Sequence, residues 1–221
     1  MAIKKHDFVE IEYTGRLAED DAVFDTTDEK LAKETGIGQP DSDYSPVIIC
    51  VGENQVLPGI DREIMGKKEG SYTFQFSPEE AFGKKDARLI QLIPTIKFRK
   101  ENINPMPGMQ VNVDGTMGIV RTVTGGRTLV DFNHPLAGKD VKYDLKINRI
   151  VTDQKEQADA YLDITLRLKE KNIKIEGNKA TVDTDIELPD EVKSKLEDKM
   201  KQIFNFESIT FRKKPEKDKK A

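Results

Sequence analysis

The stretch Val56-Leu57-Pro58-Gly59-Ile60-Asp61 constrains the fold of this chain more than any other. It follows the apolar run 47–52, which predicts a buried strand, and it leads into an apolar-rich helical turn at 60–65. Proline fixes its own φ angle, and glycine adopts conformations that other residues resist, so this pair favours a tight entry into the helix. The apolar members of the stretch are therefore expected in a core whose other walls come from elsewhere in the chain.

Length and composition indicate a globular protein with room for two or three small domains, because the chain has 221 residues. Hydrophobic residues make up 36% and charged residues 34%, and the net charge is −4, so nucleic acid is not an expected partner. No apolar run approaches the ~18 residues of a membrane span, and no apolar segment follows the first residues as in a signal peptide. We therefore expect no membrane association and a cytoplasmic location.

Neither metal nor cofactor chemistry is indicated. The single cysteine, Cys50, excludes an internal disulfide and lies among apolar neighbours, so we expect a small buried side chain. One cysteine and two histidines do not form a zinc constellation. We predict no metal site and no cofactor.

Residues 1–85 read mainly as strands joined by tight turns. Apolar and β-forming residues predict strands over 8–17, 23–27, 47–52 and 72–76, and a further strand over 141–147 with apolar residues to 151. A helical turn is expected over 28–33, capped by Thr27 or Asp28. Ser77, Pro78 and Gly83 are the cap, first position and end of a second helical turn.

About 50 residues interrupt this pattern between Gly83 and the strand at 141. Short β segments separated by glycine and proline, with a hairpin turn at Gly125-Gly126, predict a small β sheet or barrel over residues 86–130. The flanking connections are compatible with an inserted domain.

The part after residue 152 has a different character. Residues 153–170 alternate like a strand but also place apolar side chains on one helix face, and we favour the helix. A hairpin over 173–182, a helix over 190–204 and a strand over 208–212 complete a small α+β unit without a catalytic motif. The basic residues 213–220 predict a disordered, solvated tail.

Several motifs occur along the chain in a particular order and spacing: Tyr13, Phe24-Asp25, Gly52, Val56-Leu57-Pro58-Gly59, Ala81-Phe82-Gly83 and Tyr143-Asp144. Over residues 5–85 and 131–151, this set resembles the FKBP-type peptidyl-prolyl cis-trans isomerases. The insertion resembles the SlyD-like branch, and the C-terminal unit resembles its long archaeal forms. The resemblance implies an α+β fold, in which an antiparallel half-barrel sheet surrounds a short helix. It also implies an isomerase domain of 1–85 plus 131–152, an inserted chaperone-like β domain of 86–130 and a C-terminal α+β domain of 153–221.

The family resemblance implies a role for each site residue. Asp25, Tyr13, Phe82 and Tyr143 would be catalytic, and Phe24, Val56, Leu57, Ile60 and Leu136 would bind substrate. Leu57 would offer its N–H to a substrate carbonyl, and Asp25 would polarise or orient the twisting amide. The alternatives are that Tyr13 and Phe24 are ordinary core residues and that Asp25 caps a turn.

Three departures from the family pattern qualify these roles. Ile60 stands where the family usually has tryptophan, and Phe82 replaces a tyrosine of the flap. Both changes put macrolide affinity in doubt more than catalysis. The histidine-rich tail of bacterial SlyD is absent, which removes the case for nickel.

The insertion carries more apolar residues than a segment of its size can bury. We expect about half of these apolar residues to form the core of the insert. We predict that Leu89, Ile90, Leu92, Ile93, Met106 and Met109 form a chaperone surface. The expected partners are unfolded or partly folded polypeptides with X–Pro bonds. The alternative function is a non-catalytic holdase or scaffold with a vestigial isomerase pocket. For the C-terminal unit, homodimerisation, ribosome docking and further client binding stay open.

Overall fold

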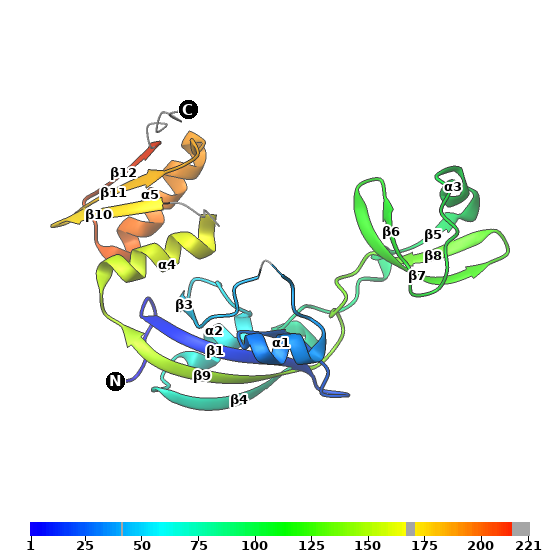
Figure 1. The fold of residues 1–221 in the computed structure, drawn as a ribbon, viewed down its shortest axis with the longest axis horizontal. Coiled ribbons are helices and arrows are strands. Elements are labelled where there is room, and N and C mark those ends of the chain that lie inside the picture. The colour runs from blue at the N-terminus through cyan, green and yellow to red at the C-terminus, as the bar shows by residue number, and fades with distance from the viewer. Residues whose placement is uncertain (41, 167–170, 214–221) are drawn as a thin grey trace. The chain divides into compact units, whose positions relative to one another are not determined.

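The structure is a computed structural model that describes residues 1–40, 42–166 and 171–213 (Figure 1). Contacts divide the chain into two compact units. The first unit contains residues 1–16, residues 22–74 and the described residues from Lys142 onward, and the second contains residues 17–21 and 75–141. The division into three domains predicted above stays a prediction.

A five-stranded sheet organises the first unit, in the order β2-β1-β9-β4 with β3 also paired to β1. Its strands are β1 (Phe8–Leu17), β2 (Val23–Thr26), β3 (Val47–Cys50), β4 (Gly70–Phe76) and β9 (Val141–Val151). The first half of β1 pairs antiparallel with β3 and the second half antiparallel with β2. The expected strands are therefore confirmed, and the last of them continues to Val151.

Two short helices follow from their end signals. Helix α1 (Glu29–Thr35) begins after Asp28, whose carboxylate accepts the N–H groups of Lys30 and Leu31. Helix α2 (Pro58–Ile64) has proline at its first position and Leu57 as its N-cap, and it buries Ile60 and Ile64. Of the two caps considered for the first helix, Asp28 is correct.

The second unit contains a four-stranded sheet in the order β5-β8-β7-β6. Its strands are β5 (Ile90–Pro94), β6 (Gln110–Val113), β7 (Thr116–Thr124) and β8 (Arg127–Asp131), and two single turns precede β5 at η1 (Pro78–Glu80) and η2 (Ala87–Leu89). The hairpin at Gly125-Gly126 is confirmed, as is the turn after Ser77, where Ser77 and Glu80 form a capping box.

Helix α3 (Thr95–Lys100) was not predicted, because the segment was assigned only β structure. It begins directly after Pro94 and places Phe98 in the core of the sheet. That core consists of Ile93, Phe98, Val111, Val120 and Val130. The small sheet thus buries its apolar face with the help of one short helix.

The C-terminal elements fold as an α+β arrangement. They are α4 (Gln154–Leu166), β10 (Lys171–Glu176), β11 (Lys179–Thr184), α5 (Asp190–Phe204) and β12 (Ser208–Lys213). Strands β10 and β11 form the expected hairpin, and β12 pairs parallel to β11. The preference for a helix over 153–170 is confirmed as far as Leu166, whereas residues 167–170 and the basic tail from 214 lie outside the described residues.

One hydrophobic cluster joins the C-terminal elements to the five-stranded sheet. Phe8 of β1 and Cys50 of β3, which are register partners, pack with Tyr161, Leu162 and Phe204 of the C-terminal helices. Cys50 is the small buried side chain expected, and burial raises the pKa of its thiol to about 12. None of the helices that the structure describes is long and apolar enough to cross a membrane.

Candidate active site

The first hairpin brings Tyr13 and Asp25 together. Tyr13 lies on β1 and Asp25 on β2, and the tyrosine hydroxyl donates a hydrogen bond to the carboxylate. The pairing is fixed beside them, since the backbone N–H of Tyr13 donates to Oγ1 of Thr27 over 2.9 Å. The hydroxyl of Thr26 donates to the carbonyl of Tyr13 over 3.2 Å. The carboxylate therefore has a defined partner and position.

Two further aromatic rings lie beside this pair. The rings of Phe24 and Tyr143 meet edge-on with centroids 5.8 Å apart, and the rings of Tyr13 and Tyr143 are 5.9 Å apart. Gly15 makes the packing possible, because a Cβ atom there would lie 2.8 Å from Cζ of Phe24 and 3.0 Å from Cε1 of Tyr143. Sequence reasoning missed Gly15, although a glycine inside a strand is a signal of close approach.

Burial changes the pKa values of these groups. Desolvation raises the pKa of Tyr13 and of Tyr143 above the usual range, and the negative charge of Asp25 adds to both shifts. Desolvation also raises the pKa of Asp25, against the hydrogen bonds from Tyr13 and from the Thr26 backbone, which lower it. Both tyrosines are therefore neutral at neutral pH, and Tyr13 donates its proton to the hydrogen bond with Asp25.

A hollow of about 260 Å³ opens at this hairpin, lined by Tyr13, Phe24 and Asp25 together with Tyr44 and Val47 among others. Tyr143 is buried behind Phe24 rather than exposed in it. Val56, Leu57 and Ile60 are not among the lining residues. Ile60 is fully buried on α2, and Val56 and Leu57 are half-buried just before that helix.

Phe82 and Leu136 belong to the second unit. Phe82 follows η1 and stacks on the ring of His134, with centroids 4.9 Å apart and planes within 4°. The N–H of Leu136 donates to Nδ1 of His134 over 3.2 Å. His134 thus contacts both of these predicted site residues, a role that its sequence context did not signal.

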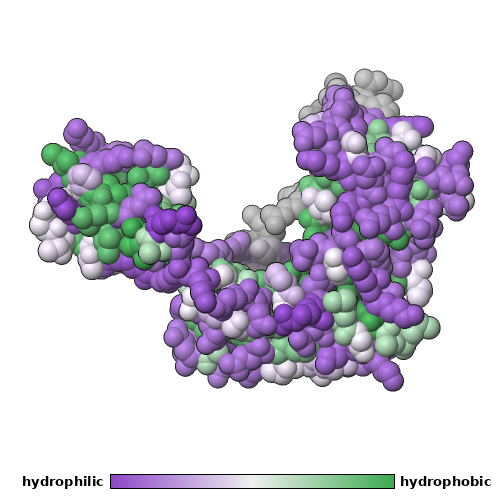
Figure 2. Space-filling view, turned by 180° about the vertical axis from the view of Figure 1, so that it is seen from behind, coloured by the Kyte–Doolittle hydropathy of each residue, from purple (hydrophilic) through white to green (hydrophobic). Residues whose placement is uncertain are grey.

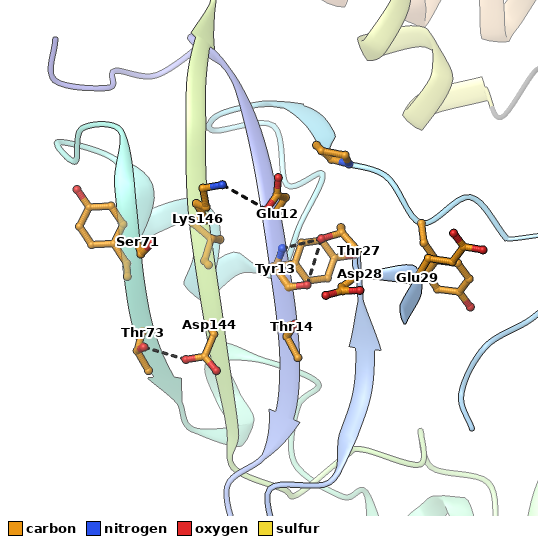
Figure 3. A pocket seen from close by; sticks show the side chains of 14 residues that line it. Glu12, Tyr13, Thr14, Thr27, Asp28, Glu29, Ser71, Thr73, Asp144 and Lys146 are labelled. Atoms are coloured by element: carbon orange, nitrogen blue, oxygen red, sulfur yellow. Dashed lines mark hydrogen bonds and ion pairs between the residues drawn. The ribbon is translucent and has the colours of Figure 1, made fainter. Parts of the chain in front are cut away.

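A larger, more polar hollow of about 620 Å³ lies on the same sheet (Figure 3). Thr73 of β4 donates to the carboxylate of Asp144 on β9 over 2.8 Å, and Lys146 pairs with Glu12 at 3.6 Å. Glu12 also accepts a hydrogen bond from the side-chain amide of Asn148. The charged groups on the strands pair with neighbouring strands, as on an ordinary solvated sheet face. The other two carboxylates of the lining belong to helix α1, where Asp28 is the N-cap and Glu29 pairs with Lys33.

The predicted chaperone residues divide between surface and core. Leu89, Leu92, Met106 and Met109 are exposed, and Ile90 is half-buried. Ile93 is a correction: it is 8% exposed and belongs to the core of the β5–β8 sheet, because adjacent residues of β5 point to opposite faces. Ile96 and Met117 add to the exposed apolar surface, which Figure 2 shows gathered on this unit.

Comparison with known proteins identifies the family. Residues 1–99 match the family model described as FKBP-type peptidyl-prolyl cis-trans isomerase. A short-type peptidyl-prolyl cis-trans isomerase of Methanocaldococcus jannaschii is 34% identical over 155 residues, which cover 70% of this chain and 98% of that protein. The chain belongs to the FKBP-type peptidyl-prolyl cis-trans isomerases. The expected α+β fold and family are thereby confirmed.

Other relatives of this FKBP-type chain agree. A probable FKBP-type 16 kDa isomerase of Pseudomonas fluorescens is 33% identical over 111 residues, covering 48% of this chain and 73% of that protein. A SlyD protein of Helicobacter pylori is 29% identical, covering 46% of this chain and 57% of that protein. Residues 91–136 match the model described as the IF domain of FKBP26, which overlaps the predicted insertion.

Proposed function

We propose that this protein accelerates cis-trans isomerisation of X–Pro bonds in polypeptide chains, and that Tyr13, Phe24, Asp25 and Tyr143 form its reaction site. The single observation that carries this proposal is the packing of the Tyr13 and Phe24 rings against Tyr143, beside the Asp25 carboxylate to which Tyr13 is hydrogen-bonded, at the hollow of the first hairpin. The membership of the chain in the FKBP-type isomerases supports the same reaction.

The reaction requires an apolar site but no chemical participation of a protein group in bond making or breaking. Rotation about an X–Pro amide has a barrier of roughly 18–20 kcal/mol, because conjugation is lost in the twisted state. The twisted amide has less charge separation than the planar amide, so an apolar, water-poor site stabilises it relative to water. Each ~1.4 kcal/mol of such stabilisation is tenfold in rate. No nucleophile and no cofactor are required.

Each residue has a place in this scheme. Phe24 would pack against the proline ring, and the buried ring of Tyr143 would support Phe24 edge-on. Val56 and Ile60 stay predicted substrate contacts. Leu57 would donate its N–H to a substrate carbonyl, since an N-cap N–H lies outside the hydrogen-bond pattern of its helix. Asp25, oriented by Tyr13, would act on the twisting amide. The predicted roles of Phe82 and Leu136 rest on the family resemblance alone.

A short-peptide assay tests the proposal. The protein should accelerate cis-to-trans conversion of an X–Pro peptide in a protease-coupled assay, and Asp25→Ala and Phe82→Ala should each slow it. Acceleration that is unchanged by both substitutions would contradict the assigned site. Suppressed aggregation without any effect on proline rates would favour the alternative, a non-catalytic holdase.

We further propose that the insert (residues 86–130) binds unfolded chain and so raises the local concentration of prolines at the reaction site. The supporting observation is the exposure of Leu92 at 53%, Met106 at 59% and Met117 at 56% on so small a unit. Flexible methionine side chains suit varied apolar partners. Homodimerisation through the C-terminal elements stays a prediction.

Deleting the insert separates the two activities. The variant without residues 86–130 should lose most of its effect on the refolding of a proline-limited protein while keeping its activity on short peptides. Equal loss on both substrates would contradict this division of labour.

A further inference from the structure

Helix α5 contacts the Gly52–Leu57 loop through the carboxylate of Glu53. This loop ends at Leu57, one of the predicted substrate contacts. The side chain of Glu53 is only 7% exposed, and its Oε2 accepts a hydrogen bond from Nζ of Lys199 over 2.9 Å. Its other oxygen lies 3.3 Å from Nε2 of His6. A nearly buried carboxylate depends strongly on such partners, because its charge is poorly solvated.

The loop that carries Glu53 is held at several points. Asp61 of α2, itself buried, accepts the N–H groups of Gly52 over 2.7 Å and of Asn54 over 3.0 Å. Oε1 of Gln55 accepts the N–H of Cys50 over 2.7 Å. Gly52 and Asn54 both have positive φ, so the loop follows a narrowly defined path into Leu57.

Helix α5 is well placed to act as a fixed support for this loop. Its residue Phe204 packs on Phe8 of β1, with ring centroids 5.3 Å apart. Met200 and Leu196 lie in the same cluster, which also contains Cys50 at the end of β3. The helix therefore packs against the strand end from which the Gly52–Leu57 loop departs.

We propose that Lys199 is a positioning residue for the isomerase: through Glu53 it holds the Gly52–Leu57 loop and so sets the place of the Leu57 N–H. The inference rests on the proposed function of that N–H in substrate binding. It gives the C-terminal segment an indirect part in the reaction, through the loop, in addition to any contact that the segment makes with clients.

The test uses the full chain and a short X–Pro peptide, which is too small to need the insert. Lys199→Met should lower kcat/KM by about threefold to tenfold, mainly as a rise in KM, because the substrate carbonyl is held less well. Lys199→Arg should restore most of the activity, since it keeps a cation near Glu53. Glu53→Gln should reproduce the loss, and the double variant should cost no more than either single one.

Lys195→Met is the matched control, because Lys195 pairs with Glu191 on the exposed side of the same helix. Hydrogen exchange gives a readout that does not depend on activity: amides of 52–57 should exchange faster in Lys199→Met than in the wild type or in Lys195→Met. Unchanged kinetics and unchanged exchange in Lys199→Met and Glu53→Gln would overturn the inference. A wild type without isomerase activity would instead overturn the proposed function, and exchange alone would then decide whether Lys199 holds the loop.

Discussion

The ring of Phe24 meets the ring of Tyr143 edge-on, at 5.8 Å between centroids and 77° between planes, over a strand position where only glycine fits. Gly15 has no Cβ atom, and one added there would come within 3.0 Å of both rings. The ring packing at the proposed reaction site therefore depends on the absence of a side chain at Gly15.

Gly15→Ala should displace the Phe24 ring and lower kcat/KM on a short peptide by about tenfold or more, because small misplacements at a reaction site are costly. Overpacking should also reduce the free energy of unfolding by about 1–3 kcal/mol. The peptide assay and denaturant unfolding measure the two effects. Ser71→Ala, an exposed change on β4 of the same sheet, is the control and should alter neither.

Tyr13→Phe should move the acidic limb of the pH–activity profile to higher pH. The pKa of Asp25 is already raised by desolvation, and the hydrogen bond from Tyr13 opposes that rise. Removing the hydroxyl should therefore raise the pKa of Asp25 further, so that the carboxylate becomes protonated at a higher pH. The profile of kcat/KM against pH measures this midpoint, and an identical midpoint in both proteins would refute the assigned pairing.

Asp25→Asn should gain stability relative to the wild type as the pH rises. Because the pKa of Asp25 is raised in the folded state, the folded state binds the proton more tightly than the unfolded state does. The charged carboxylate therefore costs stability above the ordinary Asp pKa of about 3.9. Melting temperatures at acidic and neutral pH should show the difference between the proteins growing with pH, and a difference that shrinks would contradict the pKa direction.

Leu92→Ala and Ile93→Ala should have different effects although the residues are neighbours on β5. Leu92→Ala removes exposed surface, so it should weaken suppression of aggregation while changing stability by no more than about 0.5 kcal/mol. Ile93→Ala should destabilise the insert by about 2–5 kcal/mol, because it leaves a cavity in the core. Light scattering of an aggregating client and hydrogen exchange across residues 86–130 measure the two effects. Equal exchange in both variants would contradict the assignment of the two faces.

The sequence predicts where several turns and helices begin, but it does not predict which apolar side chains pack in the core. Asp28 and Ser77 each cap a turn as their sequence context indicates, because capping involves residues only two or three apart. The burial of Ile93 was not predictable, since apolar residues occupy both faces of the run from Leu89 to Ile93. The alternation of apolar and polar residues therefore does not indicate which face of this strand is buried.

Long-range packing explains what else was missed. The contact of Phe8 with Phe204 joins residues from opposite ends of the chain, and no local pattern specifies it. Likewise, the ring cluster at Tyr13 was expected only from the family resemblance, whereas its dependence on Gly15 follows from three-dimensional proximity.

The most direct test of the account is the rate of cis-to-trans conversion of a short X–Pro peptide, measured with the wild type and with Phe24→Ala. We expect the wild type to accelerate conversion in proportion to its concentration and Phe24→Ala to lose about tenfold or more of kcat/KM, since the proline ring loses an aromatic wall. Conversion that is no faster with the wild type than without protein, or equally fast with Phe24→Ala, would contradict the account.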